Sequence, residues 1–307
     1  MSKWFDKRYH TLNYDLKTKF DKKVIKLSID GGFTCPNRDG KISTSGCIFC
    51  SERGSGEYAG DKNLSIKDQL KQQIDLLKDK WSDAKYIAYF QNFTNTYANL
   101  EELKSKYEQA LEFEDVVGIS IGTRADCLED DIIEYLKDLS KRTYLTLEIG
   151  LQTIHDKSAK FLRRGYDYSY FLKILKKLND ANINIVLHLI IGIPNETKED
   201  MIETIDTVSK LNIDGVKLHL MHIIKNTDLQ KIYEKEKFKT FEQEEYISFI
   251  CDLIEKLNPN ITIHRLTGDG SKETLIEPWW SLNKRAVLNG IDKELKLRDS
   301  YQGINYK

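Results

Sequence analysis

The sequence predicts an α/β fold in which a parallel sheet curves into a closed or partly closed barrel. Short apolar segments alternate six times with segments of helical periodicity, without a long linker or an internal repeat. The segment 183–191 is too apolar to be exposed to water on either face, which is typical of a parallel sheet covered by helices. Because strand–helix–strand connections are right-handed, six such units indicate a barrel.

Each element is predicted from its own pattern. The strands, which are runs of apolar residues, are 24–30, 86–90, 116–121, 144–149, 183–191 and 216–221. Apolar residues three and four positions apart predict the helices between and after the strands. These helices lie around 66–81, 100–111, 132–139, 155–181 (as two helices) and 197–211. Thr197 and Asp200 have the spacing of a capping box, with Asp in place of Glu.

The pattern divides the chain into three parts. Residues 1–23 form an N-terminal extension, 24–225 form the barrel core, and 226–307 form a C-terminal α/β extension that could bind substrate. The C-terminal part contains one more strand-like segment, at 261–263. The active groups of such barrels gather where strands end and loops begin, so the polar motifs at those points are the candidate site.

Composition indicates a soluble enzyme. The 307 residues include 47 Lys and Arg against 48 Asp and Glu, so no global field would attract nucleic acid and any RNA site must be local. No apolar run approaches the roughly 20 residues of a membrane span, and the N-terminus lacks the apolar core of a secretory signal. The five cysteines show no disulfide-like pattern. We therefore expect a cytoplasmic protein with no membrane partner.

Three cysteines lie in one short loop directly after the first strand: Cys35, Cys47 and Cys50. The pair Cys47-x-x-Cys50 brings two sulfurs together in a tight turn, and the glycines around it let the chain curl. Three thiolates can hold three irons of a [4Fe–4S] cluster and leave the fourth open to a ligand that is not protein. The loop therefore predicts a reactive metal centre.

A zinc site is the alternative for this loop. Structural zinc requires four ligands, usually from two paired clusters, and no second Cys-x-x-Cys or His-x-His pair stands near. Cys127 and Cys251 are isolated in sequence, and we expect both to be small buried apolar side chains. Spacing favours the iron–sulfur interpretation and leaves zinc open.

Polar residues follow the second and third strands. Gln91 and Asn95 could hydrogen-bond the carboxylate and ammonium of an amino acid, although Asn is also common in plain turns. Arg124 and Asp126 put a cation and an anion beside the mouth of the predicted barrel, and they could equally form a structural salt bridge.

The fourth and fifth strands end in further polar motifs. Strand alternation places Glu148 and Gly150 on one face, so the carboxylate points into the barrel and needs a partner that offsets its desolvation. A ribose hydroxyl pair or an arginine could be that partner. Gln152 is the last residue of the motif that contains Glu148. Gly192, after the fifth strand, lets the backbone approach a ligand, but a glycine is also ordinary where a helix begins.

Basic residues occur in three places. Lys217 and His219 share one face of the sixth strand and are candidates for substrate contact. Lys157, Lys160 and Arg164 form a stripe at helical spacing, which is typical of solvated surface.

The C-terminal part mixes basic and aromatic residues: Lys284, Arg285, Trp279, Trp280 and Tyr301. Such a mixture can stack bases and neutralise phosphates. A packed helix would look similar, with its apolar face at Leu288, Ile291 and Leu295. The histidines without an interpretable pattern are His10, His155 and His188.

These motifs resemble those of the radical S-adenosylmethionine (radical SAM) enzymes, and more closely the YhcC/YtqA-like group, whose wide Cys-x11-Cys-x2-Cys spacing this chain matches. The similar segments are 89–97, 122–126, 148–152, 163–165 and 298–303. Several also resemble those of the catalytic subunit of Elongator, which modifies the tRNA wobble uridine. Two departures are the absence of a Gly-Gly-Glu segment after the second strand and Tyr166 where relatives often have histidine, so Tyr166 is assigned no catalytic role.

The resemblance implies a partial (β/α)6 TIM-like radical SAM barrel with a C-terminal extension. Cys35, Cys47 and Cys50 would hold a [4Fe–4S] cluster, whose open iron would bind S-adenosylmethionine. An electron, from a donor such as flavodoxin or ferredoxin, would cleave this cofactor to methionine and a 5′-deoxyadenosyl radical that removes a hydrogen atom from substrate. The implied cofactor-binding residues are Gln91 and Asn95 at the amino acid end, Arg124 at its carboxylate, Glu148 at the ribose, and Gln152 and Gly192.

For the substrate, the resemblance and the basic-aromatic tail indicate tRNA, at the C5 side chain of the wobble uridine. The substrate candidates are Lys217, His219, Lys284 and Arg285, and no catalytic residue is assigned. Two alternatives stay open: radical chemistry on a small metabolite or peptide, and a zinc-stabilised RNA-binding protein without catalysis.

Overall fold

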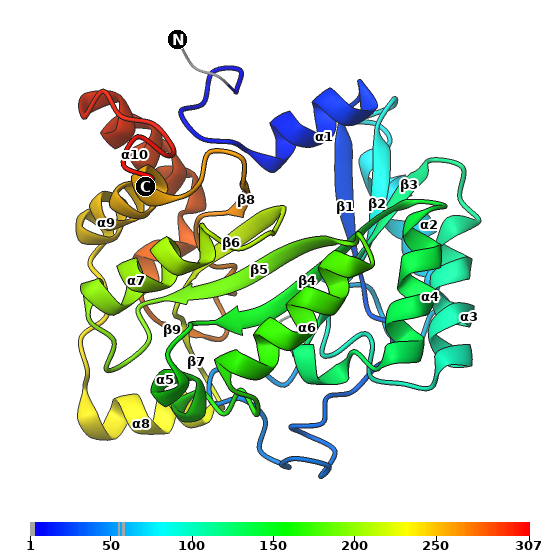
Figure 1. Ribbon diagram of the computed structural model, residues 1–307, viewed down its shortest axis with the longest axis horizontal. Helices are drawn as coiled ribbons and strands as arrows, with labels where there is room; N and C mark the ends of the chain where they lie inside the picture. The colour runs from blue at the N-terminus through cyan, green and yellow to red at the C-terminus, as the bar shows by residue number, and fades with distance from the viewer. Residues whose placement is uncertain (1–3, 55, 57–58) are drawn as a thin grey trace.

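Seven parallel strands form one curved sheet in the computed structural model, which describes residues 4–54, 56 and 59–307 (Figure 1). They are β1 (Val24–Ile29), β2 (Lys85–Phe90), β3 (Val116–Thr123), β4 (Tyr144–Gln152), β5 (Asn184–Ile191), β6 (Gly215–Leu220) and β8 (Thr262–Arg265), in that spatial order. The parallel α/β prediction is confirmed. The expected strand number is corrected, because the strand-like segment near 261–263 pairs with β6 as a seventh strand.

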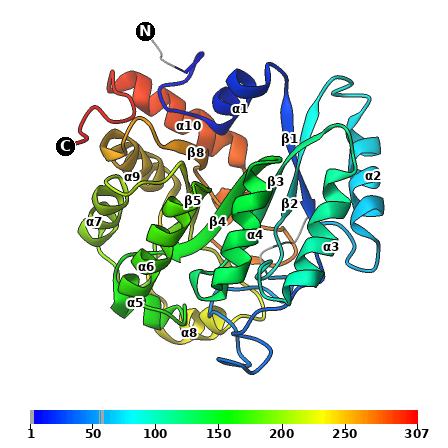
Figure 2. The same cartoon turned by 45° about the vertical axis from the view of Figure 1, so that its right-hand side comes forward.

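The helices lie outside the curved sheet, with α4 and α6 in front of it in the view of Figure 2. Their bounds are α1 (Leu12–Phe20), α2 (Ile66–Leu77), α3 (Leu100–Leu111), α4 (Asp130–Ser140), α5 (Asp156–Phe161), α6 (Tyr168–Asp180), α7 (Lys198–Val208), α8 (Asp228–Glu236), α9 (Gln243–Lys256) and α10 (Lys284–Leu297). The predicted capping box of Thr197 and Asp200 is present at the start of α7.

Two details of the predicted helices are corrected. The first one ends at Leu77, and Trp81 lies beyond it in an exposed turn. In α10 the side chain at Leu288 is exposed, and Val287 packs in the core together with Ile291 and Leu295. Ile291 and Leu295 are thus buried as predicted, and only the position before them differs.

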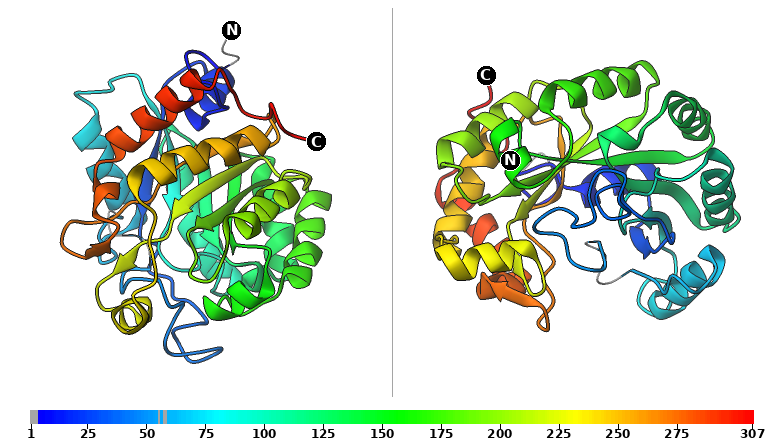
Figure 3. Two further views of the ribbon diagram at one scale, coloured as in Figure 1. Left: turned by 90° about the vertical axis from the view of Figure 1, so that its left-hand side faces the viewer. Right: turned by 90° about the horizontal axis from the view of Figure 1, so that it is seen from below.

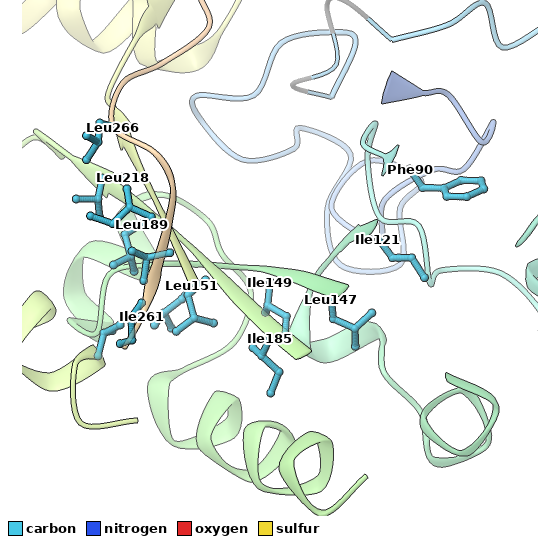
Figure 4. Packing of buried hydrophobic residues seen from close by; sticks show 14 of the residues in the cluster. Phe90, Ile121, Leu147, Ile149, Leu151, Ile185, Leu189, Leu218, Ile261 and Leu266 are labelled. Carbon is cyan, nitrogen blue, oxygen red and sulfur yellow. The ribbon is translucent and has the colours of Figure 1, made fainter. Parts of the chain in front are cut away.

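The two faces of the sheet differ in chemistry because side chains alternate along each strand. The outward residues of β4 are Leu147, Ile149 and Leu151, and Figure 4 shows them among the labelled apolar side chains of neighbouring strands. The inward set includes polar residues from successive strands: Lys26, Ser120, Glu148, His188 and Lys217. The core thus lies between sheet and helices, and the concave face is left for a polar site.

The loop that follows β1 lies within the curve of the sheet when the molecule is viewed from below (Figure 3). The edge strands β1 and β8 are not neighbours in the sheet over the described residues, so the barrel is partial. The N-terminal segment lies along β8, where the backbone N–H of Ile263 donates to the carbonyl of His10 at 2.7 Å. A short antiparallel pair, β7 (Ile223–Ile224) with β9 (Leu275–Glu277), follows β6.

Within the described residues, no helix combines the length and the apolar character that crossing a bilayer would require.

Candidate active site

The cysteine loop and the polar face of the sheet enclose one cavity. Cys35, Cys47 and Cys50 all line it, and the strands contribute the rest of its wall. These wall residues include Tyr89, Gln91, Arg124, Glu148, Gln152, His188, Lys217, His219 and Arg265. The cavity lies at the carboxyl ends of the strands, where the sequence placed the polar motifs.

Side-chain hydrogen bonds hold the cysteine loop in position. Nδ2 of Asn37 donates to Sγ of Cys47 at 3.3 Å and to the carbonyl of Arg163 at 2.7 Å. Arg38 donates to the carbonyl oxygens of Cys50 and Ser51 at 3.1 and 2.5 Å. These contacts tie the loop to itself and to the turn after α5, so the three sulfurs face the cavity on a fixed backbone.

The spacing of the sulfurs fits a cluster better than a single metal ion. Among the described residues, the one group of three or more ligand atoms within 4.8 Å of one another is His155, Asp200 and Glu203, so at least one pair of the three cysteine sulfurs is further apart than that limit. Sulfurs of a tetrahedral zinc site, with Zn–S near 2.3 Å, lie only about 3.8 Å apart. The arrangement is therefore wider than a single zinc ion would set, and three thiols around a larger group are compatible with it.

The environment of Cys47 favours the protonated thiol when no metal is bound. Burial raises the pKa of the Cys47 thiol to about 11, and neighbouring Cys50 contributes to the rise, while Arg124 and the hydrogen bond from Asn37 oppose it. A bound iron would supply the positive charge that stabilises the thiolate here. Cys127 and Cys251 are buried outside this loop, as expected.

Arg124 forms the predicted pair with Asp126. Its Nε and Nη2 donate to the carboxylate at 2.8 and 2.7 Å, and Nη2 also donates to the carbonyl of Arg164 at 2.6 Å. Tyr166 lies beside both guanidinium groups, with Arg124 at 5.6 Å and Arg164 at 4.8 Å from its ring centre. Arg124 therefore serves in a salt bridge and still lines the cavity.

Glu148 is the centre of a buried ionic network. Its Oε1 accepts from Lys26 at 2.6 Å and from Ser120 at 2.8 Å, while Oε2 accepts from Lys217 and lies 2.7 Å from Nε2 of His188. Although burial alone would raise it, Lys217 and Lys26 hold the pKa of Glu148 well below its usual range. The partner that offsets its desolvation is thus a pair of lysines, neither of the two partners considered from sequence.

The other predicted cofactor residues separate into two groups. Gln91 and Gln152 line the cavity, and Gln91 accepts from Ser28 at 2.9 Å. Asn95 and Gly192 lie outside the cavity lining. Nδ2 of Asn95 donates to the carbonyl of Gly122 at 2.9 Å, and Gly192 has a φ of 90°, where its missing side chain leaves room for Phe241. These two residues hold the turns that follow β2 and β5.

The predicted substrate residues also lie in different places. Lys217 and His219 face the cavity. Lys284 forms an ion pair with Asp269, a lining residue, whereas Arg285 is exposed on the first turn of α10.

The basic stripe near α5 is corrected at one position. Lys157 and Lys160 are exposed, but Arg164 is buried and donates to the carbonyls of Leu151, Thr153 and Tyr166 at 2.7 to 2.8 Å. Helical spacing misplaced Arg164 because α5 ends at Phe161.

Sequence reasoning assigned no role to several residues of the site: Lys26, Tyr89, His188, His222, Arg265 and Asp269. Strand alternation could have given Lys26 and His188 a role, since both share the inward face with Glu148. His222 and Arg265 stand at the carboxyl ends of β6 and β8, as the other polar motifs do at their strands, and Asp269 follows β8 with no local pattern of its own.

Comparison with known proteins decides the family. The family model described as the radical SAM superfamily matches residues 35–208, and the radical SAM C-terminal domain model matches 213–297. The chain belongs to the radical SAM superfamily. It is 47% identical to YtqA of Bacillus subtilis over 97% of this chain and 92% of that protein.

Two further matches are more distant. A tRNA uridine(34) acetyltransferase of Methanocaldococcus infernus is 30% identical over 44% of this chain, which corresponds to 25% of that protein. The solved structure of an N-terminally truncated Elp3 from Methanocaldococcus infernus superposes with a TM-score of 0.68 at 17% identity, covering 91% of this chain and 64% of that one. This structure shows the shared fold.

As a radical SAM enzyme, this protein uses a [4Fe–4S] cluster and S-adenosylmethionine, which together supply a 5′-deoxyadenosyl radical. Cys35, Cys47 and Cys50 have the number, chemistry and placement to hold the cluster. The buried network around Glu148 forms part of the wall of the cavity and fixes the position of its polar side chains.

Proposed function

We propose that this radical SAM enzyme modifies the C5 side chain of the wobble uridine in tRNA. In this proposal, Gln91 and Arg124 contact the methionyl end of S-adenosylmethionine, and Gln152 and Glu148 lie beside its ribose. Asn95 and Gly192 hold the turns after β2 and β5, next to the same pocket. Lys217, which pairs with Glu148, and His219 on the same strand meet the substrate.

The observation that carries the proposal is an exposed basic-aromatic surface next to the cavity, formed by Trp279, Lys284 and Arg285. Trp279 is 53% exposed, and Lys284 pairs with the lining residue Asp269. An exposed indole beside cations suits a single-stranded loop, whose bases stack on aromatic rings while its phosphates meet the charges. The partial match to a tRNA uridine(34) acetyltransferase agrees with a wobble-uridine substrate.

The test compares tRNA nucleosides from a wild-type strain and a deletion strain by mass spectrometry. We expect one modified uridine to be lost and its precursor to accumulate in the deletion strain. Complementation with the wild-type gene should restore the modified uridine, and complementation with a Cys47→Ala gene should not. An unchanged set of modified uridines in the deletion strain would reject the tRNA proposal and favour a small metabolite or peptide as substrate.

A second measurement uses the purified enzyme. Anaerobically reconstituted protein with dithionite should form 5′-deoxyadenosine faster when tRNA from the deletion strain is added than when wild-type tRNA is added. Replacement of Trp279 by Ala should lower this stimulation and leave the unstimulated formation unchanged, because the indole lies outside the cavity lining. Equal rates with both tRNA samples would contradict the proposal.

A further inference from the structure

The wall of the cavity that includes the ends of β6 and β8 is rich in basic side chains. Its Lys217 shares the carboxylate of Glu148 with Lys26 of β1. Arg265 and Lys284 share the carboxylate of Asp269, with Arg265 at 2.5 Å. Four basic groups therefore meet two carboxylates, and burial lowers the pKa of Lys217 to about 7, a shift that a further anion beside it would oppose.

From this wall we infer a subsite, formed by Lys217, Arg265 and His222, that binds an anionic group of the substrate. Carboxylate and phosphate both have the required chemistry, since each offers several acceptor oxygens to a guanidinium and an ammonium. The inference rests on the proposed function in that the anion belongs to the substituent of the modified uridine.

Unsatisfied polar atoms at the same wall point to a missing ligand. Nε2 of His222 is buried without a hydrogen-bond partner, on a side chain that lines the cavity and belongs to a residue only 8% exposed. Nε2 of His219, on the same wall, also has no partner. Buried polar atoms in native proteins are almost always paired, so two orphans facing one cavity indicate a group that would pair with them.

Burial keeps the two histidines of this wall uncharged. Burial lowers the pKa of His222 to about 4, and Lys284 and Arg265 lower it as well. Burial and then Arg265 hold the pKa of His219 well below its usual range. Both imidazoles are therefore neutral at neutral pH, and each can donate one N–H to an anion without adding charge.

We assign the anion to the substrate rather than to the cofactors. The cysteines that would hold the cluster lie on the segment after β1, whereas this wall is formed by the ends of β6 and β8 and the segments after them.

Close packing of the loop after β8 shapes the subsite. A Cβ atom at Gly268 would lie 2.3 Å from Cε1 of His222, so only glycine allows the backbone to approach the imidazole here. Arg265 and Asp269 flank this glycine on the same segment. The loop thus holds the guanidinium and the imidazole together at the lining of the cavity.

The test measures binding of three probes to the anaerobically reconstituted enzyme by isothermal titration calorimetry. The probes are 5-carboxymethyluridine, its matched neutral amide 5-carbamoylmethyluridine, and inorganic phosphate. We expect the carboxylate nucleoside to bind at least about tenfold tighter than the amide, since a charge-assisted contact is replaced by a neutral one. An Arg265→Gln variant should remove that difference, and an Arg265→Lys variant should retain part of it.

Control variants separate loss of the subsite from loss of the fold. Lys176→Gln changes an exposed lysine on α6 and should bind all three probes like the wild type. A His222→Asn variant should weaken the carboxylate probe selectively. Each variant is first compared with the wild type by circular dichroism and iron content. If Arg265→Gln lost iron or helical signal, the binding of the carboxylate and amide probes to Arg265→Lys and His222→Asn, compared with wild type, would decide whether the subsite exists.

The outcomes distinguish this inference from the proposed function. Equal affinity of wild type for the carboxylate and the amide, together with no phosphate binding, would overturn the anionic subsite, whatever the tRNA nucleosides of the deletion strain show. Phosphate binding that Arg265→Gln abolishes, with neither nucleoside bound, would support the subsite and count against a uridine substrate. Tighter binding of phosphate than of the carboxylate nucleoside would assign the subsite to a phosphate.

Discussion

Nδ2 of Asn37 lies 3.3 Å from Sγ of Cys47 and donates a hydrogen bond to it. Hydrogen bonds to cluster sulfurs stabilise the more negative, reduced state and raise the reduction potential. We expect Asn37→Ala to lower the midpoint potential of the reconstituted cluster, measured by redox titration with EPR detection. Asn289→Ala, an exposed change on α10, is the control, and an equal potential in both variants would contradict the expectation.

Loss of one cluster cysteine should abolish iron binding. Cys47→Ala leaves two thiols in the cavity, too few to retain the cluster, so the visible absorbance of the reconstituted protein should fall to background. Cys251→Ala is the matched control, because this buried thiol packs within α9 and should cost only about 1 kcal/mol of stability while iron content stays unchanged. Iron and sulfide assays check both variants, and full iron content in Cys47→Ala would refute the ligand assignment.

The carboxylate of Glu148 should be required for stability. Glu148→Gln leaves Lys26 and Lys217 buried without their shared counter-charge, which should cost about 3 to 5 kcal/mol in the free energy of unfolding. Because the charges interact, a Glu148→Gln/Lys217→Met double variant should lose less than the sum of the single variants. Chemical denaturation of all three proteins measures the coupling, and strict additivity would show that the network is not an energetic unit.

Arg164 and Lys160 belong to the same predicted stripe but should behave differently. Arg164→Met removes donors from three backbone carbonyls and should lower the free energy of unfolding by about 3 kcal/mol or more. Lys160→Met changes an exposed side chain and should stay within about 0.5 kcal/mol of wild type. Thermal unfolding midpoints compare the two, and similar midpoints would mean that the Arg164 contacts contribute little.

His222 should make the protein less stable in acid. Its pKa is about 4 in the folded protein, against about 6.5 when unfolded, so below pH 6.5 the unfolded state binds more protons and stability falls as pH falls towards 4. The loss attributable to this one group should reach about 2 kcal/mol at pH 5. The thermal midpoint of the reconstituted enzyme should therefore drop less between pH 7.5 and 5 in a His222→Asn variant than in wild type. Equal drops of the thermal midpoint in wild type and in His222→Asn would exclude His222 as the cause of the acid sensitivity.

The alternation of patterns along the chain was enough to predict the sheet. Six of its seven strands were identified to within three residues at each end, because a parallel sheet buries both faces and its strands are apolar runs. The Thr197 capping box and the burial of Cys127 and Cys251 were also confirmed. The short strand β8 was identified only as strand-like, since four residues carry little periodicity and its pairing with β6 is long-range.

The site was predictable where chemistry is local. The three cysteines and Arg124, Glu148 and Lys217 were identified from spacing or strand alternation, and all line one cavity. Asn95 and Gly192 fit the motifs equally well but support turns outside the lining, because sequence does not tell whether a polar side chain faces a ligand or a carbonyl.

The sequence by itself determined the alternating α/β order and the position of the three thiols, since side-chain periodicity and thiol spacing are properties of short segments. Only the tertiary structure decided which distant charges meet. Glu148 shares its carboxylate with Lys26 and Lys217, 122 and 69 positions away along the chain, and Arg265 joins their wall from the C-terminal part. These encounters depend on the curvature of the sheet and on the register of strands, which no local pattern encodes.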